Sequence, residues 1–160
     1  MRRFALTIAA VVALACPFAI HPLKASATRP YYGCRFNPLT LSFGQYDVFN
    51  PNATPIAGSL TYVCAHMEDD VHISISAGQS NTYINRYMTN TADPKQRLRY
   101  QLSLSPDCGR PFGDGFDDSD DYDLDPRTET GSIHIFGVVY PRQDVSAGRY
   151  SDQLEVTINY

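Results

Sequence analysis

The sequence is poor in basic residues and contains no tryptophan. Its 160 residues include 13 Lys and Arg against 17 Asp and Glu, which gives a formal net charge of −4. A shortage of basic residues argues against nucleic acid as a partner, because affinity for nucleic acid depends on neutralising phosphates. The length suits one well-cored domain of the usual size, about 100 to 200 residues, and argues against a two-domain enzyme.

Helical periodicity is also missing. Beyond the apolar N-terminus, no long window places apolar residues three and four positions apart, as an amphipathic helix would. The chain instead contains 11 Tyr, 8 Phe, 10 Gly and 11 Pro. Aromatic residues suit the pleated surface of a sheet, whereas Pro and Gly end short elements. The composition therefore predicts an all-β protein and excludes a helical bundle.

Residues 1–27 have the features of a secretory signal peptide. Arg2 and Arg3 supply a positive start, residues 4–20 are almost wholly apolar, and the small residues 25–27 are of the kind after which a signal peptidase cleaves. We therefore expect a mature domain at residues 28–160. Cleavage would remove three basic residues and no acidic ones, leaving ten basic and seventeen acidic side chains and a formal charge of −7.

Two other interpretations of this N-terminus carry less support. A membrane anchor is disfavoured because Pro17 interrupts the apolar run, which is shorter than the roughly 20 residues that span a bilayer. Cleavage before Cys16, as in a lipoprotein, lacks the usual Leu three places before the cysteine. We therefore expect no membrane span in the mature chain.

Three cysteines remain after residue 27, at positions 34, 64 and 108. In an oxidising compartment disulfides form and persist. A bridge between Cys34 and Cys64 would tie the first strand to the second and stabilise the fold by about 3 to 4 kcal/mol in the chain-entropy model. Cys108 lies in a turn-like segment with no feature that would activate a thiol, so we expect it to be unpaired and not nucleophilic.

Apolar residues recur at every second position in six windows, which is the period of a strand with one buried face. The expected strands cover residues 39–43, 60–64, 71–77, 98–104, 133–139 and 154–160, with a further short element near Tyr87 and Met88. Segments rich in Gly, Pro and Asn separate them. Six such strands, with a disulfide from the first to the second, predict a two-sheet sandwich of immunoglobulin-like architecture.

A sandwich of this kind ordinarily has at least seven strands, so the predicted fold is one strand short. The last expected strand shows the cleanest alternation, with Leu154, Val156, Ile158 and Tyr160 separated by polar residues. Without a successor, it would leave backbone groups unpaired and an apolar face half covered, which favours association. A strand from a partner could fill the gap.

Several segments resemble the spore coat protein U domain, a family of secreted pilus subunits of archaic chaperone-usher systems. They are Cys34 with residues 39–47, and residues 58–64, 73–78, 86–88, 98–102, 112–115 and 148–160. The resemblance extends from Gly33 to Tyr160. It implies an immunoglobulin-like fold that lacks its last strand and is completed by strand addition.

Partners, location and role follow from the same resemblance. It implies a periplasmic chaperone, an usher and neighbouring pilus subunits as partners, with export through the periplasm to the cell surface or a pilus. The implied role is structural and serves surface adhesion and biofilm formation. It implies neither an enzymatic activity nor a cofactor.

The implied mechanism also places an acceptor groove on particular residues. One wall would consist of Leu154, Val156, Ile158 and Tyr160, and the opposite wall of Leu39, Leu41 and Phe43. Backbone groups of the last strand would pair with the incoming strand, whose alternate apolar side chains would enter the groove. The alternative interpretation is that these residues are ordinary core. The two interpretations are compatible, because the walls of an acceptor groove belong to a core that lacks its seventh strand.

One feature departs from the family pattern. If cleavage follows residue 27, only residues 28–33 precede Cys34, which is too short for a donor strand of several alternating apolar residues. A longer extension from Cys16 would contain Pro17, Pro22 and Pro30, each lacking the amide that a ladder requires. We therefore expect a subunit that accepts a strand but donates none, located at a fibre end or limiting assembly.

Seven Asp residues lie between Asp114 and Asp125. Clustered carboxylates suit calcium, but Pro126 and Ser132 stand where a loop of the EF-hand type has Gly and Glu. We favour a solvated loop, since blocks of like charge are usually exposed. The alternative function is a free-standing secreted binding module that uses this stretch to bind calcium.

No arrangement of residues suggests catalysis. The histidines after residue 27 are His66, His72 and His134, and none has metalloprotease spacing or neighbours a nucleophile motif. His72 and His134 occupy the polar phase of their expected strands, which predicts exposed side chains. We therefore predict a protein that is not an enzyme, with no cofactor and no metal ligands among these histidines.

Overall fold

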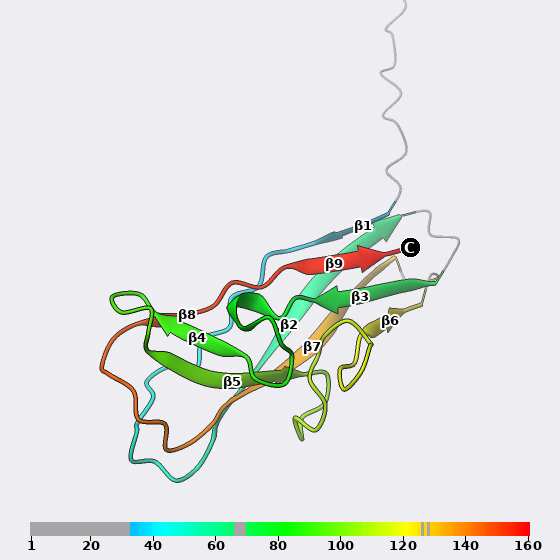
Figure 1. The fold of residues 1–160 in the computed structure, drawn as a ribbon. Coiled ribbons are helices and arrows are strands. Elements are labelled where there is room, and N and C mark those ends of the chain that lie inside the picture. The colour runs from blue at the N-terminus through cyan, green and yellow to red at the C-terminus, as the bar shows by residue number, and fades with distance from the viewer. Residues whose placement is uncertain (1–32, 66–69, 126, 128) are drawn as a thin grey trace, which may run out of the picture. The chain divides into compact units, whose positions relative to one another are not determined.

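The computed structural model of the chain describes residues 33–65, 70–125, 127 and 129–160. The expected signal peptide at residues 1–27 lies outside the described residues. Nine strands and one short 3-10 helix form the described fold (Figure 1). They are β1 (Gly33–Phe36), β2 (Thr54–Ala65), β3 (Val71–Ile75), η1 (Gly78–Ser80), β4 (Tyr87–Asn90), β5 (Arg97–Ser103), β6 (Tyr122–Leu124), β7 (Thr130–Val139), β8 (Tyr150–Ser151) and β9 (Val156–Asn159).

The larger sheet has six strands in the order β1-β2-β7-β5-β4-β8. Its centre is the antiparallel pair β2 and β7, which runs over ten residue pairs from Thr54 opposite Val139 to Val63 opposite Thr130. Side chains along both strands alternate between buried and exposed, as the period of two requires. This long pair is the frame on which the rest of the sheet is built.

The smaller sheet has three strands in the order β6-β3-β9. β3 lies in the middle and pairs antiparallel with β6 over three residue pairs and with β9 over four. Both faces of β3 are largely buried, because Ile73, Ser74 and Ile75 are all buried, whereas His72 is exposed. This sheet is much shorter than the first.

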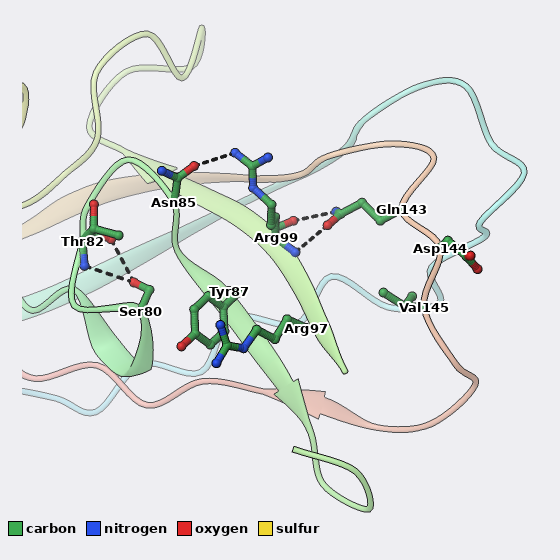
Figure 2. Close-up of a pocket in the computed structure, with 9 residues that line it drawn as sticks. All are labelled: Ser80, Thr82, Asn85, Tyr87, Arg97, Arg99, Gln143, Asp144 and Val145. Atoms are coloured by element: carbon green, nitrogen blue, oxygen red, sulfur yellow. Dashed lines mark hydrogen bonds between the residues drawn. The ribbon is translucent and has the colours of Figure 1, made fainter. Parts of the chain in front are cut away.

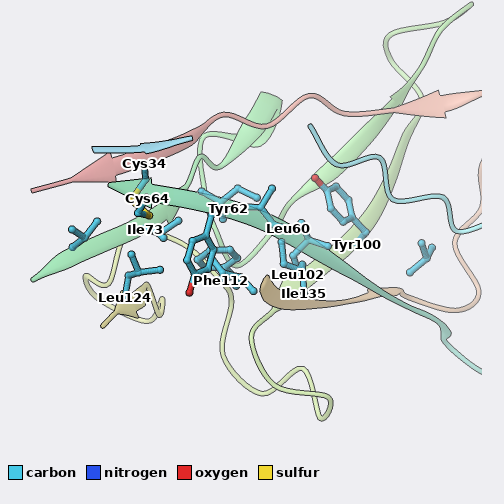
Figure 3. Packing of buried hydrophobic residues seen from close by; sticks show 14 of the residues in the cluster. Cys34, Leu60, Tyr62, Cys64, Ile73, Tyr100, Leu102, Phe112, Leu124 and Ile135 are labelled. Carbon is cyan, nitrogen blue, oxygen red and sulfur yellow. A yellow bond between two sulfur atoms is a disulfide. The ribbon is translucent and has the colours of Figure 1, made fainter. Parts of the chain in front are cut away.

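One hydrophobic cluster draws on both sheets, as expected for a two-layer sandwich (Figure 3). Leu60 and Tyr62 of β2 meet Ile73 of β3 in this cluster, together with Phe112 from the connection between β5 and β6. The predicted all-β, two-sheet fold is confirmed. Within the described residues no helix has the length and apolar character needed to cross a membrane.

The predicted disulfide is also confirmed. Cys34 of β1 and Cys64 of β2 are directly opposite each other in the ladder and are bonded, with their Cα atoms 4.0 Å apart. The bridge therefore fixes the pairing of the first two strands. Cys108 is a free cysteine, as expected.

The first expected strand is wrong in position. Residues 39–43 form no strand, and the first strand is instead β1 at Gly33–Phe36. The Asn37 amide still donates to the Thr61 carbonyl at 3.1 Å, but the chain then leaves the edge of β2. The alternation of apolar and polar residues in 39–43 therefore indicates that one face of this segment packs against the core. It does not indicate a hydrogen-bonded strand.

The other five expected strands correspond to β2, β3, β5, β7 and β9, and the short element near Tyr87 and Met88 is β4. The count of six missed β1, β6 and β8, which have only four, three and two residues. β9 is also short, but the alternation around it runs from residue 154 to 160, whereas β1, β6 and β8 lie in no alternating window of that length, so periodicity does not detect them.

Candidate functional site

The outer edge of β9 is the most distinctive surface feature for function. β9 pairs with β3 through Ile158 opposite Ile73 and Val156 opposite Ile75, and it ends the order of its sheet. No strand of the described chain pairs with its other edge. An edge of this kind can accept a further strand.

The inner face of this segment carries apolar side chains that are only half buried. Leu154, Val156 and Ile158 pack against the hydrophobic cluster but keep part of their surface accessible. Residues between them, such as Glu155 and Thr157, are exposed. The structure therefore places three of the predicted groove residues on one face of one segment, with area left to bury.

The expected opposite wall follows β1 and lies against the larger sheet. Leu39, Leu41 and Phe43 are also half buried and pack against the same cluster. Leu41 lies where a side chain at Gly58 would be, and the Phe43 ring is 3.0 Å from the position that a Cβ of Gly137 would take. Two glycines of β2 and β7 thus make room for this apolar segment.

Tyr100 of β5 links the two sets of residues. Its ring packs edge-on against Phe43, with centroids 6.0 Å apart, and its hydroxyl donates to Asp152 Oδ2 at 2.7 Å. Asp152 lies two residues before Leu154. Burial raises the pKa of Tyr100 above its ordinary value, and the hydrogen bond to Asp152 acts in the same direction.

Tyr160 plays a different part from the other predicted groove residues. Its side chain is 69% exposed, and its hydroxyl accepts a hydrogen bond from the Cys34 amide at 3.0 Å. Gly33 permits this contact, because its φ is +104° and the Tyr160 hydroxyl occupies the place of a Cβ. Tyr160 therefore connects the end of β9 with the start of β1.

A buried polar cluster anchors the segment that leads into β9. The Arg86 guanidinium is fully buried, and its Nη2 donates to the Ser76 carbonyl at 2.8 Å. The Ser76 amide donates to the Glu155 carbonyl at 2.8 Å, and the Glu155 amide donates to Ser76 Oγ at 2.9 Å. These bonds hold residue 155 against the end of β3.

Arg86 forms no salt bridge with a carboxylate of the described residues. Its Nε and Nη1 have no hydrogen-bond partner among the described residues, and its guanidinium lies 5.1 Å from the Tyr83 ring centroid. Burial lowers the pKa of this guanidinium, whereas Tyr100, Tyr83 and Asp152 act in the opposite direction. Sequence reasoning missed this role, since arginine rarely occupies a fully buried position.

The sequence comparison decides the family. Residues 5–157 match the Spore Coat Protein U domain. The chain belongs to the Spore Coat Protein U domain family. No match was found among curated proteins.

Solved structures that resemble this Spore Coat Protein U domain include two chaperone complexes. The first is the CsuC-CsuE chaperone-tip adhesion subunit pre-assembly complex from archaic chaperone-usher Csu pili of Acinetobacter baumannii. One of its chains matches with a TM-score of 0.55 and 18% identity, over 79% of this chain and 39% of that chain. A chaperone-tip adhesin complex of CFA/I fimbriae biogenesis gives a TM-score of 0.49 and 10% identity, over 79% of this chain and 41% of the other.

The likeness to the first complex concerns the fold. This Spore Coat Protein U domain spans 39% of the length of that chain and shares its sandwich architecture. The predicted immunoglobulin-like fold class is therefore confirmed.

The Asp-rich stretch of the Spore Coat Protein U domain does not direct its carboxylates to one point. Asp114 accepts hydrogen bonds from the Ser119 hydroxyl at 2.9 Å and the Phe116 amide at 3.2 Å. Asp120 pairs with Arg110 at 3.0 Å, and Asp125 accepts from the Arg127 amide at 2.9 Å. Only Asp121 and Asp123 of this stretch lie together, beside His72. Calcium binding by the whole stretch, the alternative to the favoured solvated loop, remains untested.

Partial burial acts to raise the pKa of Asp114. Hydrogen bonds from the Phe116 amide and the Ser119 hydroxyl outweigh it, so the pKa of Asp114 is lowered. Burial raises the pKa of the Cys108 thiol, which keeps it in the unreactive form. Neither the Asp114 carboxylate nor the Cys108 thiol therefore shows the pKa shift expected of a catalytic group.

A shallow pocket lies on the outer face of β4 and β5 (Figure 2). The Arg97 guanidinium stacks over the Tyr87 ring at 4.3 Å from its centroid, as Figure 2 shows. Arg99 Nη2 donates to Asn85 Oδ1 at 2.7 Å, and the Arg99 amide donates to Gln143 Oε1 at 2.7 Å. Most polar groups of this pocket therefore bond one another.

Proposed function

We propose that the chain is a structural subunit or accessory of a chaperone-usher pilus, and that a strand from a partner completes its sandwich beside β9. The observation that carries this proposal is the outer edge of β9, where Val156 and Ile158 remain half buried. Membership of the Spore Coat Protein U domain family supports it. So does the likeness to a chain from a chaperone-subunit complex.

The mechanism is donor-strand complementation. Backbone groups of the incoming strand pair along β9, and its alternate side chains enter the space between two sets of residues. These are Leu154, Val156, Ile158 and the nearby Tyr160 on one side, and Leu39, Leu41 and Phe43 on the other. Burial of about four apolar side chains contributes on the order of 6 to 12 kcal/mol before ordering costs.

The same proposal gives the route and the partners. Residues 1–27 are removed on export and residues 28–160 form the mature domain. A periplasmic chaperone donates the first strand, an usher receives the complex, and a neighbouring pilus subunit replaces the chaperone. The assembled protein serves attachment to surfaces and biofilm formation.

Co-expression with the periplasmic chaperone of the same chaperone-usher system tests the proposal. We expect the two proteins to copurify as a one-to-one complex, and Ile158→Asp to abolish it, because a carboxylate would enter the apolar space. Thr157→Asp is the matched control: it adds the same charge on the exposed face of the same strand and should leave the complex intact.

Two outcomes contradict the proposal. In one, the chain alone is monomeric and has the same thermal stability with and without the chaperone. In the other, Ile158→Asp and Thr157→Asp copurify with the chaperone equally well.

A further inference from the structure

His72 of β3 faces two carboxylates on the surface of the smaller sheet. Its Nδ1 lies 2.7 Å from Asp123 Oδ1 and 3.2 Å from Asp121 Oδ2. One potential ligand atom from each of the three residues lies within 4.8 Å of the others. Sequence periodicity predicted an exposed His72, which is confirmed at 50% side-chain exposure, but it could not reveal this convergence.

Backbone pairing sets the position of two of these residues. His72 and Asp123 are directly opposite each other in the antiparallel ladder of β3 and β6. Side chains of directly opposite residues project from the same face of a sheet, so the imidazole and the carboxylate must meet. The contact is therefore a consequence of the register and does not depend on a flexible loop.

The third residue is held by the loop before β6. Gly115 has φ of +81° and no side chain, and the carboxylate carbon of Asp121 lies 2.7 Å from the position of its missing Cβ. The backbone next to Asp121 is fixed as well, because the Asp120 amide donates to the Pro111 carbonyl at 2.8 Å. The Asp121 side chain is correspondingly only 27% exposed.

The spacing of these atoms fits a metal shell. Zinc bonds of about 2.1 Å to nitrogen and oxygen place neighbouring ligand atoms about 3.0 to 3.4 Å apart in octahedral or tetrahedral geometry. The two distances from His72 Nδ1, 2.7 and 3.2 Å, lie within a few tenths of an ångström of this range, and the two carboxylate oxygens lie within 4.8 Å of each other. An imidazole nitrogen with two carboxylates also suits zinc better than calcium, which prefers oxygen ligands throughout.

We propose that His72, Asp121 and Asp123 bind one divalent transition-metal ion of the zinc type, with water completing the shell. The ion joins β6 to β3 and stabilises a pair that backbone hydrogen bonds hold over three residues only. This site is separate from the strand-acceptor edge, because β6 and β9 lie on opposite sides of β3. The competing interpretation is an ordinary ion pair between a protonated His72 and the two carboxylates.

Calorimetric titration with zinc chloride tests the proposal on the exported chain, purified without a polyhistidine tag. We expect one zinc ion per chain. His72→Ala should weaken binding at least tenfold, since even loss of an outer-shell partner weakens metal affinity about 10- to 100-fold. His134→Ala is the matched control: it removes another exposed strand histidine, whose Nδ1 lies 3.2 Å from Ser59 Oγ, and should leave zinc binding unchanged.

Asp123→Asn provides a second test in case His72→Ala does not fold. It keeps the shape of the side chain but weakens the ligand, so zinc affinity should again fall at least tenfold. Absence of zinc binding to the wild type, or equal affinity in the wild type and both variants, would overturn the proposal. A third result would also overturn it: one calcium ion binds per chain as tightly as zinc, and His72→Ala leaves that calcium affinity unchanged. The acidic stretch alone would then be the binding site.

Discussion

The two sheets of this domain differ greatly in the length of their strand pairs. In the larger sheet, β2 and β7 share ten residue pairs, and a disulfide joins β2 to β1. In the smaller sheet, β3 has three pairs with β6 and four with β9. Both sheets contribute to one core, yet only the smaller one consists entirely of short ladders.

The smaller sheet therefore has less pairing of its own to hold it than the larger sheet has. A long central ladder satisfies its own backbone groups and buries its own side chains. A short sheet that ends at β9 leaves half-buried apolar side chains beside an edge with which no strand of the described residues pairs. The smaller sheet is thus the part whose stability should respond to a partner strand.

The largest expected effect comes from paired deletions in the two sheets. Ile133 of β7 and Ile73 of β3 are both completely buried, so Ile→Ala removes the same atoms from each sheet. We expect Ile133→Ala to destabilise by about 4 kcal/mol and Ile73→Ala by about 2 to 3 kcal/mol, because loosely held surroundings collapse around a cavity more readily. Urea unfolding followed by far-UV circular dichroism suits a protein without tryptophan.

The difference between the two variants should become smaller when the chaperone is bound. In the complex, Ile73→Ala should approach the loss caused by Ile133→Ala, since an added strand would stiffen the smaller sheet. A free protein in which Ile73→Ala destabilises as much as Ile133→Ala would show that the two sheets are equally rigid.

The next largest effect concerns the covalent link of the larger sheet. Replacement of both Cys34 and Cys64 by Ala should lower the free energy of unfolding by about 3 to 4 kcal/mol, because the bridge closes a loop with a sequence separation of 30 residues. Cys108→Ala, which removes a free thiol, is the control and should change stability little. Equal effects of the two changes would mean that the disulfide contributes nothing to the larger sheet.

The smallest effect concerns the contact between β9 and β1. Tyr160→Phe removes the hydroxyl that accepts the Cys34 amide hydrogen and should destabilise by about 1 kcal/mol or less. Hydrogen exchange at the Cys34 amide should become faster. Tyr150→Phe removes another tyrosine hydroxyl, bonded to the Ser146 carbonyl at 2.7 Å, and should leave that amide unchanged. Unaltered exchange in Tyr160→Phe would show that the contact gives no protection.

Long strands and the disulfide could be predicted from the sequence. Alternation over five residues or more located β2, β3, β5, β7 and β9, because burial of one face imposes a period of two. Cys34 and Cys64 could be paired because Cys34 lies at the start of the expected mature domain, Cys64 ends an expected strand, and an exported domain favours disulfides. The half-buried residues from Leu154 to Ile158 were also visible as an alternating run that reaches the end of the sequence.

Features that depend on three-dimensional convergence could not be predicted. Residues 39–43 alternate like a strand, yet their backbone lies in no ladder, and periodicity reports the buried face alone. Arg86 is buried beside the Ser76 carbonyl and the Tyr83 ring. No local sequence pattern predicts that these three residues meet. His72 meets Asp121 and Asp123 only because β3 and β6 pair in one particular register.

The cross-strand disulfide has a mechanical consequence. A pull on the chain at Gly33 would load β1, whose ladder with β2 has only four residue pairs. The bond between Cys34 and Cys64 transfers that tension covalently to β2, and from there to the ten-pair ladder with β7. The domain can therefore bear a stretching force at its N-terminal edge without first separating the short β1–β2 pair.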